Sequence, residues 1–312
     1  MKLHRLQGSA LALMLATGLV AQTPTYLDPD DPNPSRGNQG IVKTLYMGPF
    51  SVPAARVVNG QLIPGEYEQN VNNVANPGTG WVTGYDNRIV DTNYLPVDQF
   101  APEGGSDFYL HHAVFVNRSV SDLTCQFMPG ERFAASGGER MPFVIPNGYG
   151  YPINASDRFT ALMHIQNFTA QSRQVYLEYS FTMQDLAEPY VAVRPWWLDV
   201  VWCTSSYNVP TGTGLHVRQR DYSASRAMTL LSLGPHLHCG GSKLELINKA
   251  TGQPIWTFTN DPTACPTVME TAMPSVGVPV PVGTTVTIKS TYQQSASTTI
   301  DAMGIVLCYV LR

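Results

Sequence analysis

Short segments in which apolar and polar residues alternate recur along this chain, and they restrict the folds that it can adopt. A period of two places the apolar side chains on one face of a β-strand. The 26 glycines and 24 prolines supply turns between such segments, and the low charged fraction of 13% argues against long solvated helices. We therefore predict an all-β fold class built from sandwiches. The clearest segments are Val42–Met47, Phe108–Val116, Val175–Thr182, Ser242–Ile247, Thr284–Ser290 and Ala302–Leu311.

The N-terminus has the pattern of a secretory signal peptide. A basic start, Met1–Arg5, precedes the apolar run Ala10–Ala16 and a group of small residues. This order predicts a signal peptide over residues 1–21, cleaved near Ala21, and a protein that is secreted or periplasmic. Residues 22–40 are rich in Pro, Asp and Asn and predict a flexible leader. No later stretch is long and apolar enough to predict a membrane span.

The rest of the chain is long enough for two domains. A chain of 312 residues exceeds the usual size of a single domain. The Pro-containing segment Ala187–Pro195 indicates a crossing between two halves of similar size, and each half carries a histidine cluster. We predict an N-terminal β-sandwich over residues 41–190 and a C-terminal β-sandwich over residues 191–312.

Cysteine content and charge limit the compartment and the partners. Five cysteines fit an oxidising compartment with one or two disulfides and leave at least one thiol outside an intrachain pair. Their connectivity stays open, although Cys265 is the nearest candidate partner of Cys239 in the sequence. Acidic side chains outnumber basic ones by 23 to 19, which argues against nucleic acid or an anionic membrane as a partner. The five are Cys125, Cys203, Cys239, Cys265 and Cys308.

The segment Gly234-Pro235-His236-Leu237-His238 contains half of a candidate metal site. Residues two apart in a strand point to the same face, so the imidazoles of His236 and His238 would lie side by side. Imidazole is the commonest metal ligand in proteins. The alternative interpretation is two solvated histidines near a turn.

Three further histidines form a second candidate group. His111 and His112 are adjacent, so they point to opposite faces of a regular strand and can bind one metal only at a strand end, bend or bulge. His164 is a single histidine in an apolar strand, where a hydrogen-bonded core residue is the alternative. We interpret His216 as structural.

A set of imidazoles joined by a thioether would favour copper. Met303 could complete the group of His236 and His238, although the residues alone do not single it out among 11 methionines. Such a soft, neutral set stabilises Cu(I), whereas zinc more often recruits a carboxylate or thiolate and calcium needs oxygen ligands. The sequence has no HExxH, GxSxG, P-loop or dinucleotide-binding signature, so hydrolase and nucleotide-binding functions lack support.

The order of these motifs resembles that of the ascorbate-dependent type II copper monooxygenases, which include peptidylglycine α-hydroxylating monooxygenase and dopamine β-monooxygenase. Those enzymes carry a His-His pair, a lone His in a strand, a His-x-His motif and a Met in the final strand. The chain is more similar still to the plant stress-up-regulated nodule protein family and its bacterial relatives. The segments that carry the likeness are Leu45–Val52, Tyr109–Phe115, Leu162–Ile165, Gly234–Gly241 and Ala302–Ile305.

The resemblance implies a fold, a ligand set and a reaction. It implies two jelly-roll-like antiparallel β-sandwich domains that face each other across a cleft. In such enzymes the all-histidine copper delivers an electron, the Met-bound copper binds dioxygen, and ascorbate is the usual reductant. The implied ligands are His111, His112 and His164 for the first copper, and His236, His238 and Met303 for the second.

The polar residues that hold a peptide substrate in that superfamily are missing from this chain. Gly234 and Leu162 stand where the peptide-amidating enzyme has an arginine and a glutamine, and Ile305 and Leu307 replace an asparagine and a tyrosine. Each replacement removes a hydrogen-bonding group from the expected substrate site. These departures argue against a glycine-extended peptide as the substrate.

Three functions stay open on the sequence alone. The first is an exported dicopper monooxygenase that hydroxylates a C–H bond of an unknown small molecule with dioxygen and a reductant such as ascorbate. The second is a non-catalytic extracytoplasmic protein that binds or sequesters copper. The third is a structural β-sandwich interaction protein. No catalytic residue is assigned beyond the copper ligands.

Overall fold

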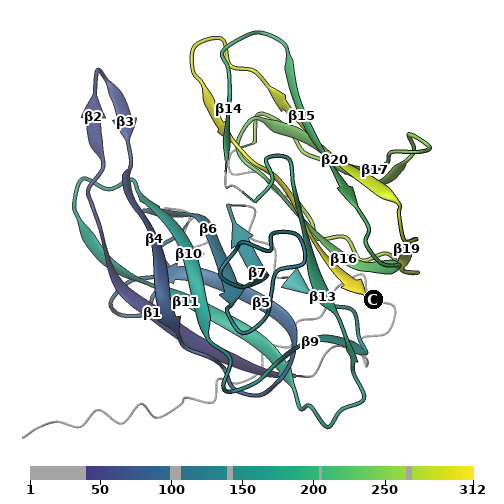
Figure 1. Ribbon diagram of the computed structural model, residues 1–312. Coiled ribbons are helices and arrows are strands. Elements are labelled where there is room, and N and C mark those ends of the chain that lie inside the picture. Colours follow the sequence, from purple (N-terminus) through teal and green to yellow (C-terminus); the bar gives the residue numbers. More distant parts are fainter. Residues whose placement is uncertain (1–39, 99–106, 139–142, 204–205, 265–268) are drawn as a thin grey trace, which may run out of the picture.

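The computed structural model describes residues 40–98, 107–138, 143–203, 206–264 and 269–312 (Figure 1). The predicted signal peptide, and all of the predicted leader except Gly40, lie outside these residues. The described residues are all-β, as the alternating segments predicted, and they include no helix. They therefore contain no helix with the length and apolarity needed to span a membrane.

Two sheets form the first half of the chain. One has the strand order β1-β11-β5-β9-β12, with β8 also paired to β5, and the other has the order β4-β10-β6-β7. A two-stranded ribbon, β2-β3, projects from this half (Figure 1). The bounds are β1 (Ile41–Val52), β2 (Arg56–Val58), β3 (Gln61–Ile63), β4 (Gly65–Val74), β5 (Gly80–Val90), β6 (Phe108–Asn117), β7 (Glu131–Gly137), β8 (Phe143–Val144), β9 (Tyr149–Ile153), β10 (Phe159–Asn167), β11 (Arg173–Gln184) and β12 (Val191–Ala192).

The second half also consists mainly of two four-stranded sheets. Their strand orders are β13-β22-β16-β19 and β15-β20-β17-β18, and β14 pairs with β21 beside them. The bounds are β13 (Arg194–Asp199), β14 (Tyr207–Val209), β15 (Leu215–Ser223), β16 (Met228–Leu237), β17 (Gly241–Asn248), β18 (Pro254–Thr259), β19 (Val278–Val280), β20 (Thr285–Gln293), β21 (Ile300–Ala302) and β22 (Gly304–Leu311).

The two halves share one strand order, although the sequence contains no tandem repeat. When the short strands β2, β3, β8 and β12 are set aside, the first half keeps eight strands, and their ranks in chain order run 1-8-3-6 in one sheet and 2-7-4-5 in the other. Setting aside β14 and β21 gives the same two series for the second half. Each half encloses its own apolar core between its two sheets.

Strand β11 illustrates how the alternating pattern produces these cores. From Val175 to Met183 every second residue is buried, while the residues between them are half-buried. Tyr179 and Phe181 pack against Phe115 of the opposite sheet, with ring centroids 5.0 and 5.7 Å apart. The period of two in the sequence therefore marks the face of the strand that meets the core.

Strand β22 is buried on both faces. Its even-numbered residues from Val306 to Val310 pack into the core of the second half, and the odd-numbered ones from Ile305 to Tyr309 pack with the core of the first half. The phenol of Tyr309 donates a hydrogen bond to the Phe133 carbonyl, and its ring lies 4.5 Å from that of Phe143. A strand covered on both sides needs apolar residues throughout, which explains the unbroken apolar run in this part of the sequence.

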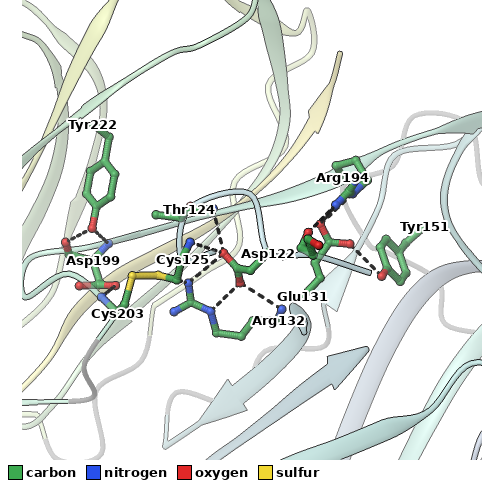
Figure 2. Close-up of polar contacts among 11 residues, drawn as sticks. Asp122, Thr124, Cys125, Glu131, Arg132, Tyr151, Arg194, Asp199, Cys203 and Tyr222 are labelled. Atoms are coloured by element: carbon green, nitrogen blue, oxygen red, sulfur yellow. Dashed lines mark hydrogen bonds and ion pairs between the residues drawn. A yellow bond between two sulfur atoms is a disulfide. The ribbon is translucent and has the colours of Figure 1, made fainter. Parts of the chain in front are cut away.

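A disulfide and a buried ion pair also join the halves (Figure 2). Cys125 of the first half is bonded to Cys203 of the second. Beside it, Arg132 donates from Nε to Asp122 over 2.9 Å, and its guanidinium lies 4.6 Å from the ring of Trp197 in β13. Both charged side chains are almost fully buried. The arginine thus binds an acid of its own half while it packs on an aromatic ring of the other.

A second buried carboxylate, Glu131, forms another polar contact between the halves (Figure 2). Arg194 at the start of β13 donates from Nε to Oε1 over 2.7 Å, and the Tyr151 hydroxyl donates to Oε2 over 2.9 Å. Burial nevertheless raises the pKa of Glu131 to about 7. The link therefore depends on Arg194 to offset the cost of a buried charge.

The remaining cysteines agree with the predicted oxidising compartment. Cys239 is disulfide-bonded as well, while Cys265, its suggested partner, lies outside the described residues. Cys308 is a free, buried thiol in β22.

The strand β12 pairs with β9 of the first half and β13 pairs with β22 of the second, and the predicted boundary between residues 190 and 191 stays a prediction.

Loss of the Cys125–Cys203 disulfide is expected to destabilise the protein. The bond closes a loop with a sequence separation of 78, and constraining such a loop is worth about 4 kcal/mol on the chain-entropy account. We expect the double variant Cys125→Ser/Cys203→Ser to lose about 2–5 kcal/mol of unfolding free energy in urea denaturation followed by circular dichroism. A loss below about 0.5 kcal/mol, typical of a neutral surface change, would contradict this role.

Candidate metal centre

A β-bulge brings the adjacent histidines His111 and His112 to one face of their strand. In the pairing of β6 with β10, His112 lies opposite His164 and Leu110 lies opposite Ile165, so His111 is an extra residue without a partner position. Leu110 and Ala113 are both fully buried toward the core. The two residues between them therefore both lie on the outer face. The structure thus contains the strand irregularity that the sequence required if His111 and His112 are to bind one metal ion together.

The three histidines of the first predicted site lie close together. The Nδ1 atoms of His111 and His112 are 3.1 Å apart, and the ring of His164 lies 4.4 Å from that of His111 and 5.4 Å from that of His112. One ring nitrogen from each of them lies within 4.8 Å of the others. Metal–imidazole bonds of about 2.0–2.1 Å place two ligand atoms of one ion at most about 4.2 Å apart, so side-chain rotations that close the wider separations would allow the three to bind one ion.

The environment favours the neutral form of His111 and His112. Burial and the neighbouring histidines hold the pKa of His111 far below its usual value, and they lower that of His112 to about 3. His164 Nε2 is buried and has no hydrogen-bond partner among the described residues, with the nearest carboxylate oxygen, Glu66 Oε1, 3.8 Å away. An unsatisfied buried nitrogen is costly in a folded protein, and a metal ion would satisfy it.

The second predicted group lies at the end of β16. Leu237 is buried in the core of the second half, so His236 and His238 both point away from that core, with ring centroids 5.1 Å apart. His236 pairs with Ile305 of β22. Met303 occupies the single position between β21 and β22, two residues before Ile305, and so faces the same side as His236. Met303 is 5% exposed.

Asp301 fixes the orientation of His238, and sequence reasoning missed it. His238 Nδ1 lies 3.0 Å from the Asp301 carbonyl oxygen and 3.4 Å from its carboxylate. These acceptors hold the proton on Nδ1 and leave Nε2 as the ligand atom, the second-layer arrangement typical of metal-binding histidines. Burial lowers the pKa of His238, although Asp301 opposes the shift. His238 Nε2 is buried and has no hydrogen-bond partner among the residues that the structure describes.

Tyr292 of β20 joins the two predicted ligands through their backbones. Its hydroxyl accepts hydrogen bonds from the N–H groups of His238, over 2.8 Å, and Met303, over 3.2 Å, and it donates to the Met303 carbonyl. The side chain is fully buried. One phenol therefore fixes the end of β16 against the break between β21 and β22. The sequence carried no signal for this role, and Tyr292 lies two residues beyond the predicted strand Thr284–Ser290.

The two histidine groups are in contact with each other. The rings of His111 and His238 lie 4.3 Å apart, and His111, His238 and Asp301 offer ligand atoms within 4.8 Å of one another. The resemblance implied sites on opposite sides of a cleft, whereas here the halves meet at the histidines and the open space lies beside them. His216 belongs to neither group and packs near Tyr207.

A cavity of about 880 Å³ lies beside the histidines, between the outer faces of β4-β10-β6-β7 and β13-β22-β16-β19. His112, His236 and Met303 line it. The four positions that lack the polar substrate residues of the peptide-amidating enzyme also line it, and they are Leu162, Gly234, Ile305 and Leu307. The candidate ligands thus meet a largely apolar chamber of the size that small-molecule sites have.

Two proteins named probable copper-dependent oxygenases are similar to this chain in sequence. M1 from Phoma sp. (strain ATCC 20986 / MF5453) is 26% identical over 213 residues, which cover 66% of this chain and 52% of M1. The protein clz3 from Cochliobolus lunatus is 32% identical over 106 residues, which cover 31% of this chain and 34% of clz3. The chain thus spans about half of the first relative and about a third of the second. These similarities support a copper oxygenase family.

Other comparisons add little. No family model matches the chain. Among solved structures, PNGase F, described as a glycosylasparaginase from Flavobacterium meningosepticum, covers 86% of this chain and 95% of its own at 12% identity and a TM-score of 0.34. A recombinant N-glycanase F gives a TM-score of 0.33 at 12% identity, covering 86% of this chain and 94% of its own. Likeness at this level carries no weight for fold or function.

Removing the Tyr292 hydroxyl tests its structural role. Tyr292→Phe leaves the buried N–H groups of His238 and Met303 without their acceptor, which should lower the free energy of unfolding by about 1–3 kcal/mol. Urea denaturation measures the loss. The exposed Tyr94→Phe serves as the matched control and should change stability by less than about 0.5 kcal/mol. Equal stability of the two variants would refute the bridging role.

Proposed function

We propose that this chain is an exported dicopper monooxygenase that hydroxylates a C–H bond of a small molecule. The observation that carries the proposal is the bulge at His111. An extra residue in a strand disturbs its hydrogen-bonded ladder, and bulges recur next to active sites, where they redirect side chains. Here the bulge turns an adjacent pair of histidines, otherwise divergent, toward His164 on the neighbouring strand.

The donor sets fit copper better than other metals. His111, His112 and His164 form an all-imidazole set, and His236 and His238 with Met303 add a soft thioether, the combination that stabilises Cu(I). Zinc would more often take a thiolate or carboxylate. Asp301 is hydrogen-bonded to His238 Nδ1 and so acts behind a ligand. The relatives named copper-dependent oxygenases agree with this choice of metal.

The protein supplies positions, neutral ligands and a chamber. Bound copper would supply dioxygen binding and one-electron transfer, which the side chains cannot provide. One oxygen atom would enter the C–H bond and the other would leave as water, with two electrons from a reductant such as ascorbate and two protons. His112, His236 and Met303 face the cavity and would meet the substrate there, and the apolar lining would exclude water from the reacting carbon.

The fold and the compartment belong to the same proposal. The shared strand order, with ranks 1-8-3-6 and 2-7-4-5 in facing sheets, supports two jelly-roll domains over residues 41–190 and 191–312. The Cys125–Cys203 disulfide supports an oxidising compartment. Residues 1–21 would then be the signal peptide, cleaved near Ala21. The apolar positions at Gly234 and Leu162 support a substrate other than a glycine-extended peptide.

Copper content and oxygen consumption, measured on the same preparations, test the proposal. We expect two copper ions per chain in the wild type and one in His164→Ala. His236→Ala should lower ascorbate-driven oxygen consumption by about 100-fold or more, since even residues behind metal ligands are worth about 10–100-fold. His216→Ala, at a histidine that belongs to neither group, should match the wild type.

The outcomes separate the candidate functions. Two coppers without oxygen consumption above the His236→Ala level would favour a protein that sequesters copper. No bound copper, or a copper content unchanged in His164→Ala, would overturn the proposal and favour a structural interaction protein. Circular dichroism of each variant shows whether a loss of metal reflects a loss of the fold.

A further inference from the structure

The cavity is elongated along strand β6. His112, Val114 and Val116 alternate along this strand, Arg118 follows one residue after its end, and all four line the cavity. At about 3.3 Å per residue, the distance along the strand from His112 to Arg118 is roughly 20 Å. The candidate metal ligands therefore lie at one end of the chamber and an arginine at the other.

The middle of the chamber has apolar side chains on both walls, although Asn70, Asn72 and Thr160 also line the first wall. On one wall Leu162 of β10 lies opposite Val114 in the register of the sheet. On the other wall Leu307 pairs with both Trp197 of β13 and Gly234 of β16. These side chains offer no hydrogen bond to a ligand except the indole N–H of Trp197. This section would bind a hydrocarbon segment.

Gly234 keeps the middle of the chamber open. A Cβ atom at this position would lie 3.1 Å from Cε2 of Phe143, closer than most carbon contacts. A long side chain here would extend into the chamber, because Gly234 is itself part of the lining. The lack of a side chain thus provides a continuous passage from the histidines to Arg118.

The charges at the two ends differ in sign. Glu68, opposite His164 in the register, lines the chamber at the histidine end and is exposed. Arg118 is exposed at the far end, and its guanidinium forms no ion pair with another described residue. Arg132 also lines the chamber, but Asp122 neutralises it. An anionic group would therefore be repelled from the histidine end and attracted to Arg118.

We propose that this chamber binds a long-chain aliphatic carboxylate in one orientation. Arg118 holds the carboxylate, the hydrocarbon chain lies between the apolar walls, and its far end lies at His112, His236 and Met303. The assignment of the reacting carbon rests on the proposed function. Oxidation would then break a C–H bond remote from the carboxylate and form a C–OH bond, while the second oxygen atom leaves as water with two electrons from an ascorbate-class reductant and two protons.

Binding of dodecanoate and of methyl dodecanoate to the metal-free protein, measured by isothermal titration calorimetry, tests this inference without using activity. Dodecanoate should bind the wild type, and Arg118→Gln should weaken it about tenfold or more, the range for a lost charge-assisted hydrogen bond. The affinity for the ester, which lacks the charge, should fall by less than about twofold in the same variant. Arg158→Gln, an exposed arginine outside the lining, is the matched control and should leave both affinities unchanged.

A second variant tests the apolar section. Leu162→Trp places a large ring in the chamber and should abolish binding of both probes, whereas Val217→Trp on the exposed face of β15 should not. The inference is overturned if dodecanoate fails to bind the wild type, or if Arg118→Gln lowers the affinities for dodecanoate and its methyl ester equally. It is also overturned if Leu162→Trp binds dodecanoate as tightly as the wild type does.

Failure of the carboxylate-binding inference can be distinguished from failure of the proposed function. Intact copper content and oxygen consumption with no dodecanoate binding would reject only the substrate class. Dodecanoate binding that depends on Arg118, in a protein that takes up no copper, would reject the monooxygenase and leave a carboxylate-binding chamber.

Discussion

The packing of β22 on both of its faces is the constraint on which the rest of the structure depends. One row of its side chains completes the core of the second half, and the other row packs against the first half through contacts such as Tyr309 with Phe133 and Phe143. Because the strand belongs to both cores, the halves cannot separate without exposing apolar surface. The same strand begins directly after Met303, so the packing that joins the halves also positions a candidate ligand.

The histidine groups form a largely buried cluster at the junction of the halves. Burial keeps His111, His112 and His238 below their usual pKa values, and buried ring nitrogens of His164 and His238 lack hydrogen-bond partners among the described residues. Such an arrangement costs free energy in a metal-free protein. A metal ion would offset this cost, which supports the proposal that the cluster binds metal. The contact between His111 and His238 makes the two sites neighbours.

Much of the fold was accessible from the sequence because its physical cause is local. Alternation predicted the strands and the all-β class. The odd cysteine count predicted at least one thiol outside an intrachain pair, and Cys308 is free. The His-x-His spacing predicted that His236 and His238 share a face, and the adjacent pair required an irregularity, which is the bulge at His111. Only the family resemblance indicated Met303 as a ligand, because no local sequence pattern distinguishes it among the 11 methionines.

The features that sequence reasoning missed all depend on residues distant in the chain. Asp301 and Tyr292 act through hydrogen bonds to residues on other strands, and the Cys125–Cys203 pairing depends on how the halves dock. The closeness of His111 to His238 likewise follows from the docking, whereas the family likeness implied separate sites. Local patterns carry no information on such long-range contacts.

X-ray absorption at the copper edge of the reduced, copper-loaded protein identifies the ligand atoms themselves and so tests whether Met303 binds copper. We expect imidazole scattering together with a sulfur shell that disappears in Met303→Ala and persists in Met273→Ala, the matched change at an exposed methionine. A spectrum without sulfur, or a sulfur shell that survives Met303→Ala, would contradict the proposed copper site.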